Sequence, residues 1–211
     1  MMKTLRLSIQ APDALALAAE MLLQGKLVVF PTDTVYAVGA HAFQPEAVSR
    51  IFAAKKRPAN VAFPLLLPDP AAMESVCIDI PAVAWKIAYR FWPGGLNLVL
   101  RRAPVVPDVV TAGGPTVAVR VPDHPAVRDI CRRLGAPLAN TSANRHGQPP
   151  AVTADEAEAA LGGDISLLLD GGPCPGGVAS TVLDMTVSPP VILRPGPVSA
   201  EALYAVLSNS Q

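Results

Sequence analysis

The sequence predicts an α/β (α+β) fold in which helices surround a mixed β-sheet, and three observations lead to this prediction. Helical and extended patterns alternate along the chain without separating into blocks. Hydrophobic residues make up 51% and charged residues 16% of the 211 residues, which is typical of a compact chain with a sizeable core. No internal repeat or long linker divides the chain. We therefore expect one domain over residues 1–211.

Helices are predicted from their start and stop signals. Proline often stands at the first turn, where its missing N–H leaves no hydrogen bond unmade. Gly25 and Gly135 end two segments, Asp69 caps a third, and Thr153 with Glu156 has the spacing of a capping box. The expected helices are Pro12–Gln24, Pro45–Ala54, Pro70–Val76, Pro81–Phe91, Pro125–Leu134, Ala154–Leu161 and Ala200–Leu207.

Strands are predicted from short runs of β-branched and aliphatic residues between these helices. The expected strands are Leu27–Phe30, Phe63–Leu67, Leu96–Leu100, Thr116–Val121, Pro137–Asn140, Leu167–Leu169, Ser180–Leu183 and Val191–Leu193. In the fourth of these, the period of two places Thr116, Ala118 and Arg120 on one face. Several strands run directly into polar segments, so we expect function on loops at strand ends.

Charge and cysteine content narrow the range of functions. Seventeen basic and seventeen acidic side chains give a formal net charge of zero, so no overall field draws the protein to nucleic acid or to an anionic membrane. Cys77, Cys131 and Cys174 lie far apart and lack metal-ligand spacing, which predicts free thiols in a reducing compartment. No apolar stretch has the length of a signal peptide core or a membrane span. We expect a cytoplasmic protein without a membrane partner.

Three consecutive cations, Lys55-Lys56-Arg57, follow the helix expected over Pro45–Ala54, and they allow two interpretations. Cations at the C-terminus of a solvated helix are favoured by the helix dipole, by about 0.3–1 kcal/mol each. Alternatively, they bind phosphate, because unit charges about 4 Å apart near a protein surface interact by about 4 kcal/mol before desolvation. The helix alone does not decide between these interpretations.

Further polar segments follow other strands. Thr32, Asp33 and Thr34 interrupt an apolar run, and a small polar loop begins at Asn140. Such side chains can bind a ligand or satisfy only their own turns. Arg120, at the end of its strand, can pair on the surface or bind a carboxylate with its planar fork.

The absent motifs are informative as well. The chain contains no GxxxxGK[ST] phosphate-binding loop, no GxGxxG dinucleotide fingerprint and no nucleophile elbow. Its three histidines are too scattered to predict a metal site. Covalent catalysis therefore has no good candidate, and no resident metal is expected.

Seven segments resemble, in order and spacing, the YrdC-like family of L-threonylcarbamoyladenylate synthases. They span about Leu27 to Gly196 and read PTDTVYAVG, KKRP, WPGGLNLVL, TVAVRVPDHP, TSANRHGQP, GGPCPGGVASTVLD and ILRPG. The resemblance implies a YrdC/RibB-like fold in its single-domain form, with a twisted mixed sheet and an open concave face. It also implies a nucleotidyltransferase that joins L-threonine, bicarbonate and ATP into threonylcarbamoyl-AMP and releases pyrophosphate. The product would serve a downstream threonylcarbamoyl transferase machinery that modifies tRNA.

The resemblance assigns roles to matching positions in this sequence. The implied L-threonine ligands are Thr32, Arg120, Ser142 and Ser180, with Arg120 on the carboxylate. The implied ATP ligands are Lys55, Arg57, Thr116, Asn144 and Arg194. Lys55 and Arg57 are also the implied catalytic cations, and Mg²⁺ would accompany ATP. We expect alanine at either cation to reduce turnover without unfolding the protein.

The chain departs from the family pattern at several positions, and these departures keep alternatives open. Family members usually have Gly at the positions of Ala37 and Lys56, Lys-Pro at Val61-Ala62, and often Glu at Ala179. One alternative is a related paralogue that forms a carbamoyl or acyl adenylate. The other is a non-catalytic RNA-binding module with a local basic surface.

Overall fold

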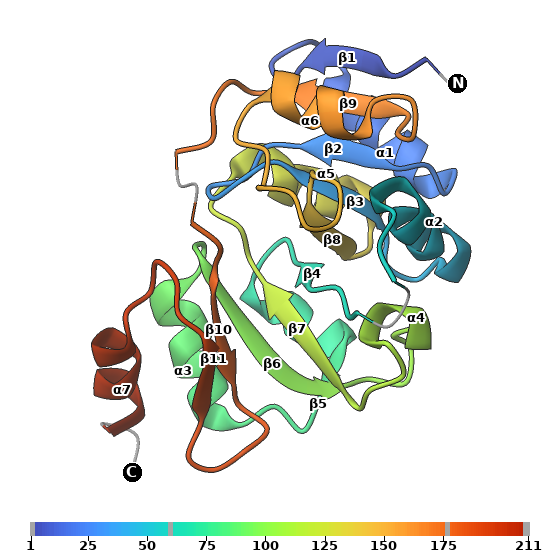
Figure 1. Cartoon of the computed structure of the whole chain (residues 1–211). Helices are drawn as coiled ribbons and strands as arrows, with labels where there is room; N and C mark the ends of the chain where they lie inside the picture. Colours follow the sequence, from blue (N-terminus) through green and yellow to red (C-terminus); the bar gives the residue numbers. More distant parts are fainter. Residues whose placement is uncertain (1–2, 59–60, 176–177, 209–211) are drawn as a thin grey trace.

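A mixed β-sheet forms the frame of the structure, a computed structural model that describes residues 3–58, 61–175 and 178–208. Its strands are β1 (Leu5–Ser8), β2 (Val28–Phe30), β3 (Ala37–His41), β4 (Leu65–Leu66), β5 (Cys77–Ile78), β6 (Leu96–Arg102), β7 (Thr116–Arg120), β8 (Leu138–Ser142), β9 (Leu167–Asp170), β10 (Thr181–Asp184) and β11 (Val191–Arg194). Their order in the sheet is β1-β9-β2-β3-β8-β4-β7-β6-β10-β11, and β5 pairs with β6. Parallel and antiparallel neighbours alternate irregularly, so the predicted α/β fold with a mixed sheet is confirmed (Figure 1).

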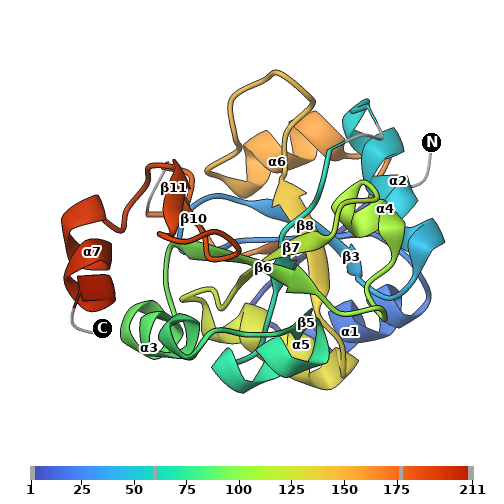
Figure 2. The same ribbon diagram turned by 90° about the horizontal axis from the view of Figure 1, so that it is seen from below.

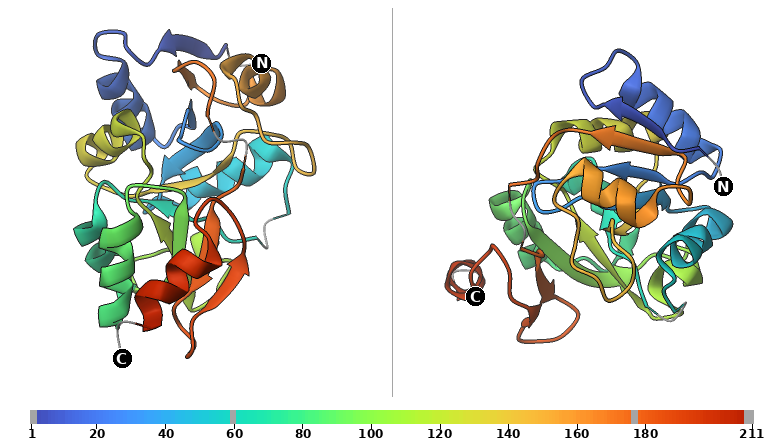
Figure 3. Two further views of the ribbon diagram at one scale, coloured as in Figure 1. Left: turned by 90° about the vertical axis from the view of Figure 1, so that its left-hand side faces the viewer. Right: turned by 45° about the horizontal axis from the view of Figure 1, so that its top comes forward.

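Helices cover both faces of this sheet. They are α1 (Ala14–Leu23), α2 (Pro45–Lys55), the 3₁₀ helix η1 (Pro70–Ser75), α3 (Ala82–Phe91), α4 (Asp108–Thr111), α5 (Pro125–Leu134), α6 (Ala154–Leu161) and α7 (Ala200–Ser208). Figure 2 shows α1 and α5 on the side of the sheet opposite α2, α4 and α6. The buried residues of α3 belong to the same hydrophobic cluster as those of α2, α4 and α6. Strand β1 and helix α7 lie at opposite ends of the molecule (Figure 3).

Local sequence signals set the helix ends. Helices α5 and α6 have the predicted bounds. At the start of α6, Thr153 Oγ1 accepts from Glu156 N at 3.2 Å, and Glu156 Oε2 accepts from Thr153 N at 3.2 Å, which is the predicted capping box. Asp69 also caps its helix, by accepting from Ala72 N at 3.2 Å. That helix is 3₁₀ rather than α along its whole length.

Four elements that the strand and helix patterns did not predict are β1, β3, β5 and α4. Strand β3 shows why, since its sequence Ala-Val-Gly-Ala-His has only one strongly strand-forming residue. It is held by pairing with β2 on one side and with β8 on the other. Gly39 is needed there, because a Cβ at this position would lie 2.8 Å from Cε1 of Phe30. Tertiary pairing therefore determines this strand.

Strand β2 shows how the sheet divides the core. All of its residues are buried. Val28 and Phe30 pack in the cluster that contains α1 and α5, whereas Val29 packs in the cluster on the opposite face. A continuous apolar run is what a strand covered on both faces requires. The chain becomes polar directly after Phe30, where it leaves the sheet.

Within residues 3–58, 61–175 and 178–208, no helix combines the length and the apolar character needed to cross a bilayer.

Tyr36 links the turn after β2 to the segment after β9 through its hydroxyl, and the contribution of this hydroxyl to stability can be measured. The fully buried Tyr36 donates to Gly172 O at 2.7 Å and accepts from Gly171 N at 3.2 Å. We expect Tyr36→Phe to lower the free energy of unfolding by about 1–2 kcal/mol, because it leaves both backbone groups without this partner. Urea denaturation measures the change. Tyr204→Phe is the control, since Tyr204 is 45% exposed, and an equal loss in both variants would contradict the prediction.

Candidate functional site

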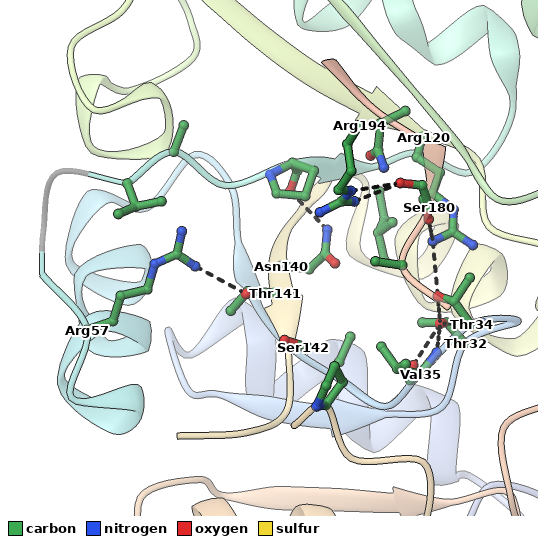
Figure 4. A pocket seen from close by; sticks show the side chains of 18 residues that line it. Thr32, Thr34, Val35, Arg57, Arg120, Asn140, Thr141, Ser142, Ser180 and Arg194 are labelled. Carbon is green, nitrogen blue, oxygen red and sulfur yellow. Dashed lines mark hydrogen bonds between the residues drawn. The ribbon is translucent and has the colours of Figure 1, made fainter. Parts of the chain in front are cut away.

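A cavity of about 380 Å³ opens where the turn after β2, the end of α2 and the strands β4, β6, β7, β8, β10 and β11 meet (Figure 4). Six predicted site residues line it: Thr32, Arg57, Arg120, Ser142, Ser180 and Arg194. Segments far apart in sequence therefore converge on one site. None of the described residues that line the cavity is an aspartate or a glutamate.

The turn after β2 is shaped by its own threonines. Thr32 Oγ1 donates to Val35 O at 2.7 Å and accepts from Thr34 N at 3.1 Å. The hydroxyls of Thr32 and Thr34 lie 3.0 Å apart. Both side chains are almost fully buried, yet both line the cavity. The sequence left open whether these side chains bind a ligand or only satisfy their own turn. Both are compatible with the structure, because the threonines hydrogen-bond within the turn and also line the cavity.

Arg120 links this turn to the opposite wall. Its guanidinium donates to Gly94 O at 2.8 Å, Ser180 Oγ at 2.6 Å and Thr34 Oγ1 at 3.3 Å, and it forms an ion pair with Asp33. Burial lowers the pKa of Arg120, and the charge of Asp33 opposes part of this shift. One N–H of the guanidinium has no partner among the described residues, so Arg120 can still donate to a ligand.

Arg194 and Arg57 lack the carboxylate that Arg120 has. Arg194 donates to Ser180 O through Nε at 3.0 Å and Nη2 at 2.8 Å. Arg57 donates to Thr141 Oγ1 at 3.2 Å, and its Cζ lies 5.2 Å from the ring centroid of Phe63. Burial lowers the pKa of both guanidinium groups. Within the described part of the chain neither forms an ion pair, so their charge is available to an anion.

Lys55 lies behind the cavity, where it holds a loop. The side chain is 3% exposed, and Nζ donates to Asn144 O at 2.6 Å, to Asn144 Oδ1 at 3.2 Å and to Ser142 O. Burial lowers the pKa of Lys55 to about 8, and the charge of Arg57 adds to this effect. The interpretation as a solvated helix end is wrong for this residue. Its predicted contact with phosphate stays a prediction, because Lys55 is not among the described lining residues.

Two other predicted ATP ligands also lie outside the described lining of the cavity. The amide of Asn144 donates to Gln148 O at 2.6 Å and to Arg145 O at 3.0 Å, so it shapes the loop after β8. Thr116 pairs with Arg101 at the start of β7. It stands four positions before Arg120, which is about 13 Å along a strand. The side chain of Asn144 thus positions the loop after β8, and Thr116 lies at the end of β7 away from Arg120. Contact of either residue with ATP stays a prediction.

Several lining residues were not assigned a role from the sequence. Thr34, Asn97, Asn140 and Thr141 add polar groups to the wall. Asn97 interrupts the apolar run Leu-Asn-Leu-Val-Leu of β6, and that interruption was the available signal. Asn140 and Thr141 belong to β8, which extends past the predicted strand end to Ser142.

The departures from the family pattern gather at this site. Ala37, Val61, Ala62 and Ala179 all line the cavity. Lys56 ends α2 with a left-handed φ of 52°, a conformation that glycine adopts without cost. Gly176 and Gly177, in the segment GGPCPGGVASTVLD that resembles the family, lie outside the described residues.

The low pKa of Lys55 makes a testable prediction for stability. Its ordinary pKa is 10.5 and its pKa in the folded protein is about 8, so between these values the unfolded chain binds more protons than the folded one. The free energy of unfolding therefore gains a contribution that rises with pH across this range. Relative to Lys55→Met, the wild type should become more stable from about pH 8 to about pH 10.5.

Chemical denaturation at several pH values checks this prediction. Lys56→Met is the matched control, because Lys56 is the exposed neighbour. The same pH profile for the wild type and for Lys55→Met would show that the ammonium group is not buried as described.

Comparisons with known proteins agree with this geometry. The family model Sua5_yciO_yrdC, described as "Telomere recombination", matches residues 20–196. The "Threonylcarbamoyl-AMP synthase" of Pyrococcus abyssi is 42% identical over 193 residues, which cover 92% of this chain and 57% of that protein. The protein of the same name from Bacillus subtilis is 40% identical over 217 residues, covering 98% and 62%.

A solved structure gives the same result for the fold. The crystal structure of P. abyssi Sua5 complexed with L-threonine aligns with a TM-score of 0.91 and 39% identity, over 98% of this chain and 61% of that one. The chain thus spans about 60% of the length of these relatives. The agreement of the YrdC-like fold, the family model and the relatives leads to one conclusion: the chain belongs to the Sua5/YciO/YrdC family.

Proposed function

We propose that this chain forms threonylcarbamoyl-AMP from L-threonine, bicarbonate and ATP, with release of pyrophosphate. The observation that carries the proposal is a cavity with two guanidinium groups, Arg57 and Arg194, that lack a carboxylate partner among the described residues. Relatives about 40% identical are named as synthases of this product, and one was crystallised with L-threonine. Together these findings support a site for a polyanion beside an amino acid.

The two ends of the cavity suggest how the substrates divide it. Arg57 lies on one side in Figure 4, and Thr32, Thr34 and Arg120 lie on the other. In this proposal the triphosphate occupies the side of Arg57 and extends toward Arg194. L-Threonine occupies the side of Arg120, where Ser180 and the spare N–H of Arg120 can donate to its carboxylate.

The chemistry needs no protein nucleophile. The amine of threonine attacks the carbon of bicarbonate, and loss of water leaves a carbamate. A carbamate oxygen then attacks the α-phosphorus of ATP, and pyrophosphate leaves. The protein orients the reactants, which can contribute about 7–11 kcal/mol to lowering a barrier. Arg57 and Arg194 would neutralise charge on the phosphates as the bond to pyrophosphate breaks.

Magnesium is part of the proposal only as a companion of ATP. No group of three or more His, Cys, Asp or Glu side chains in the described residues could hold a metal ion. The ion would be bound by phosphate oxygens and would offset part of their charge. Transfer of the product to tRNA by a separate enzyme and a cytoplasmic location complete the proposal. The free Cys77, Cys131 and Cys174 support a reducing compartment.

Pyrophosphate release tests the proposed reaction. We expect release from ATP only when L-threonine and bicarbonate are both present, with threonylcarbamoyl-AMP identified by mass spectrometry. Release with carbamoyl phosphate in place of threonine and bicarbonate would instead favour the adenylate-forming paralogue. Salt-sensitive tRNA binding without any turnover would favour the RNA-binding module.

Substitutions of the unpaired arginines test the phosphate side of the cavity. We expect Arg57→Met and Arg194→Met each to raise the KM for ATP by about ten- to a hundredfold, since each removes a charge-assisted hydrogen bond. Steady-state kinetics at saturating L-threonine measures the effect. Arg101→Met is the control, because this exposed arginine pairs with Asp79 on the surface. Unchanged KM values in both cavity variants would contradict the proposal that the triphosphate binds near Arg57 and Arg194.

A further inference from the structure

Asn97 is a buried residue whose side-chain oxygen accepts no hydrogen bond within the described part of the chain. The residue is 5% exposed and lines the cavity, and its side-chain oxygen has no partner among the described residues. Its neighbours Leu96 and Leu98 are fully buried in the core. An unpaired buried polar group lowers stability, so its presence in an otherwise apolar stretch calls for a partner that the protein itself does not supply.

The sheet register places Asn97 between two arginines of the site. On one side it lies opposite Val182, which in turn lies opposite Arg194. On the other side, the β6–β7 register continued by one pair beyond Leu98 and Val119 places Asn97 opposite Arg120. Residues opposite each other in an antiparallel pair have Cβ atoms about 4.5–5.5 Å apart and share a face of the sheet. Asn97 therefore lies in a row of paired residues across β11, β10, β6 and β7, and three members of this row, Arg194, Asn97 and Arg120, line the cavity.

The position of Asn97 beside Arg120 indicates which group of the L-threonine substrate it contacts. In the proposed function the carboxylate of L-threonine accepts from Arg120 and Ser180. The amine is attached to the same carbon as that carboxylate, so an acceptor on the strand next to Arg120 lies within reach of the amine. The amide oxygen of Asn97 is such an acceptor. It is shielded from solvent in this structure, and the inference requires that rotation about the broad terminal torsion of asparagine bring it to the cavity that the residue lines.

We infer that Asn97 is a positioning residue that accepts a hydrogen bond from the amine of the amino acid substrate. A neutral acceptor suits the chemistry better than a carboxylate would. A carboxylate stabilises an ammonium group and raises its pKa, whereas an amide beside two arginines does not. The amine is thus held as the free base whose lone pair attacks bicarbonate. This inference rests on the proposed function for the identity of the substrate.

Equilibrium binding of two ligands, one with and one without the amine, isolates the contact between Asn97 and the amine. Calorimetric titrations compare L-threonine with 3-hydroxybutyrate, which lacks the amine but keeps the carboxylate and hydroxyl. We expect Asn97→Leu to weaken L-threonine binding about tenfold and to leave 3-hydroxybutyrate unchanged. Its melting temperature should equal or exceed that of the wild type, because the unpaired amide is gone. Equal weakening of both ligands, unchanged threonine binding, or a wild type that does not distinguish the two ligands would overturn the inference.

Asn97→Asp supplies an isosteric second variant with a kinetic readout. A carboxylate at this position should hold the bound amine as ammonium, so the rising limb of the pH profile of kcat should move upward by about one pH unit or more. An unchanged pH profile would contradict the assigned contact. Threonine binding without pyrophosphate release by the wild type would refute the proposed function alone, because the binding comparison does not depend on turnover.

Discussion

The site depends on one imbalance of charge, because four cations gather at a single cavity. Lys55, Arg57, Arg120 and Arg194 lie in or behind the walls of one cavity. Among the described residues, Asp33 is the carboxylate that pairs with one of them, Arg120. Lys55 and Arg120 are almost fully buried, Arg57 is half-buried and Arg194 is exposed. Partial removal from water lowers the pKa of each of these cations. Burying a charge without its counter-charge is costly, so this cost falls mainly on Lys55, Arg57 and Arg120. A bound polyanion would supply the missing charge. Binding of the polyanion would thus relieve the unfavourable free energy of the unpaired cations, and this relief would contribute to its affinity.

The fold distributes this charge over elements that the sheet holds rigid. Arg120 and Arg194 stand on strands, so their backbones are fixed by neighbours on the ladder. Ser180 accepts from both of them, with its hydroxyl from Arg120 and with its carbonyl from Nε and Nη2 of Arg194. Lys55 fixes the loop after β8 through neutral oxygens and keeps its charge close to Arg57. Preorganised positive groups of this kind need little rearrangement when charge develops in a reaction.

Much of the fold could be predicted because its signals are local. Proline starts, glycine ends and the capping box defined α5 and α6, and apolar runs defined most strands. Strand β3 could not be predicted, because its small residues are strand only by pairing with β2 and β8. At the site, the residue types indicated which charged and hydroxyl groups are present, but not where each side chain points. Lys55 and Arg57 stand two positions apart on one helix end, yet one faces a loop and the other the cavity.

Proton uptake on ATP binding tests this account most directly. Binding of a polyanion beside Lys55 should raise the pKa of that ammonium, which is about 8 in the structure. Calorimetric titrations of ATP near pH 8, in buffers with different ionisation enthalpies, measure the number of protons exchanged. The account predicts net uptake in the wild type that is lost in Lys55→Met. Binding heats that do not depend on the buffer would contradict it.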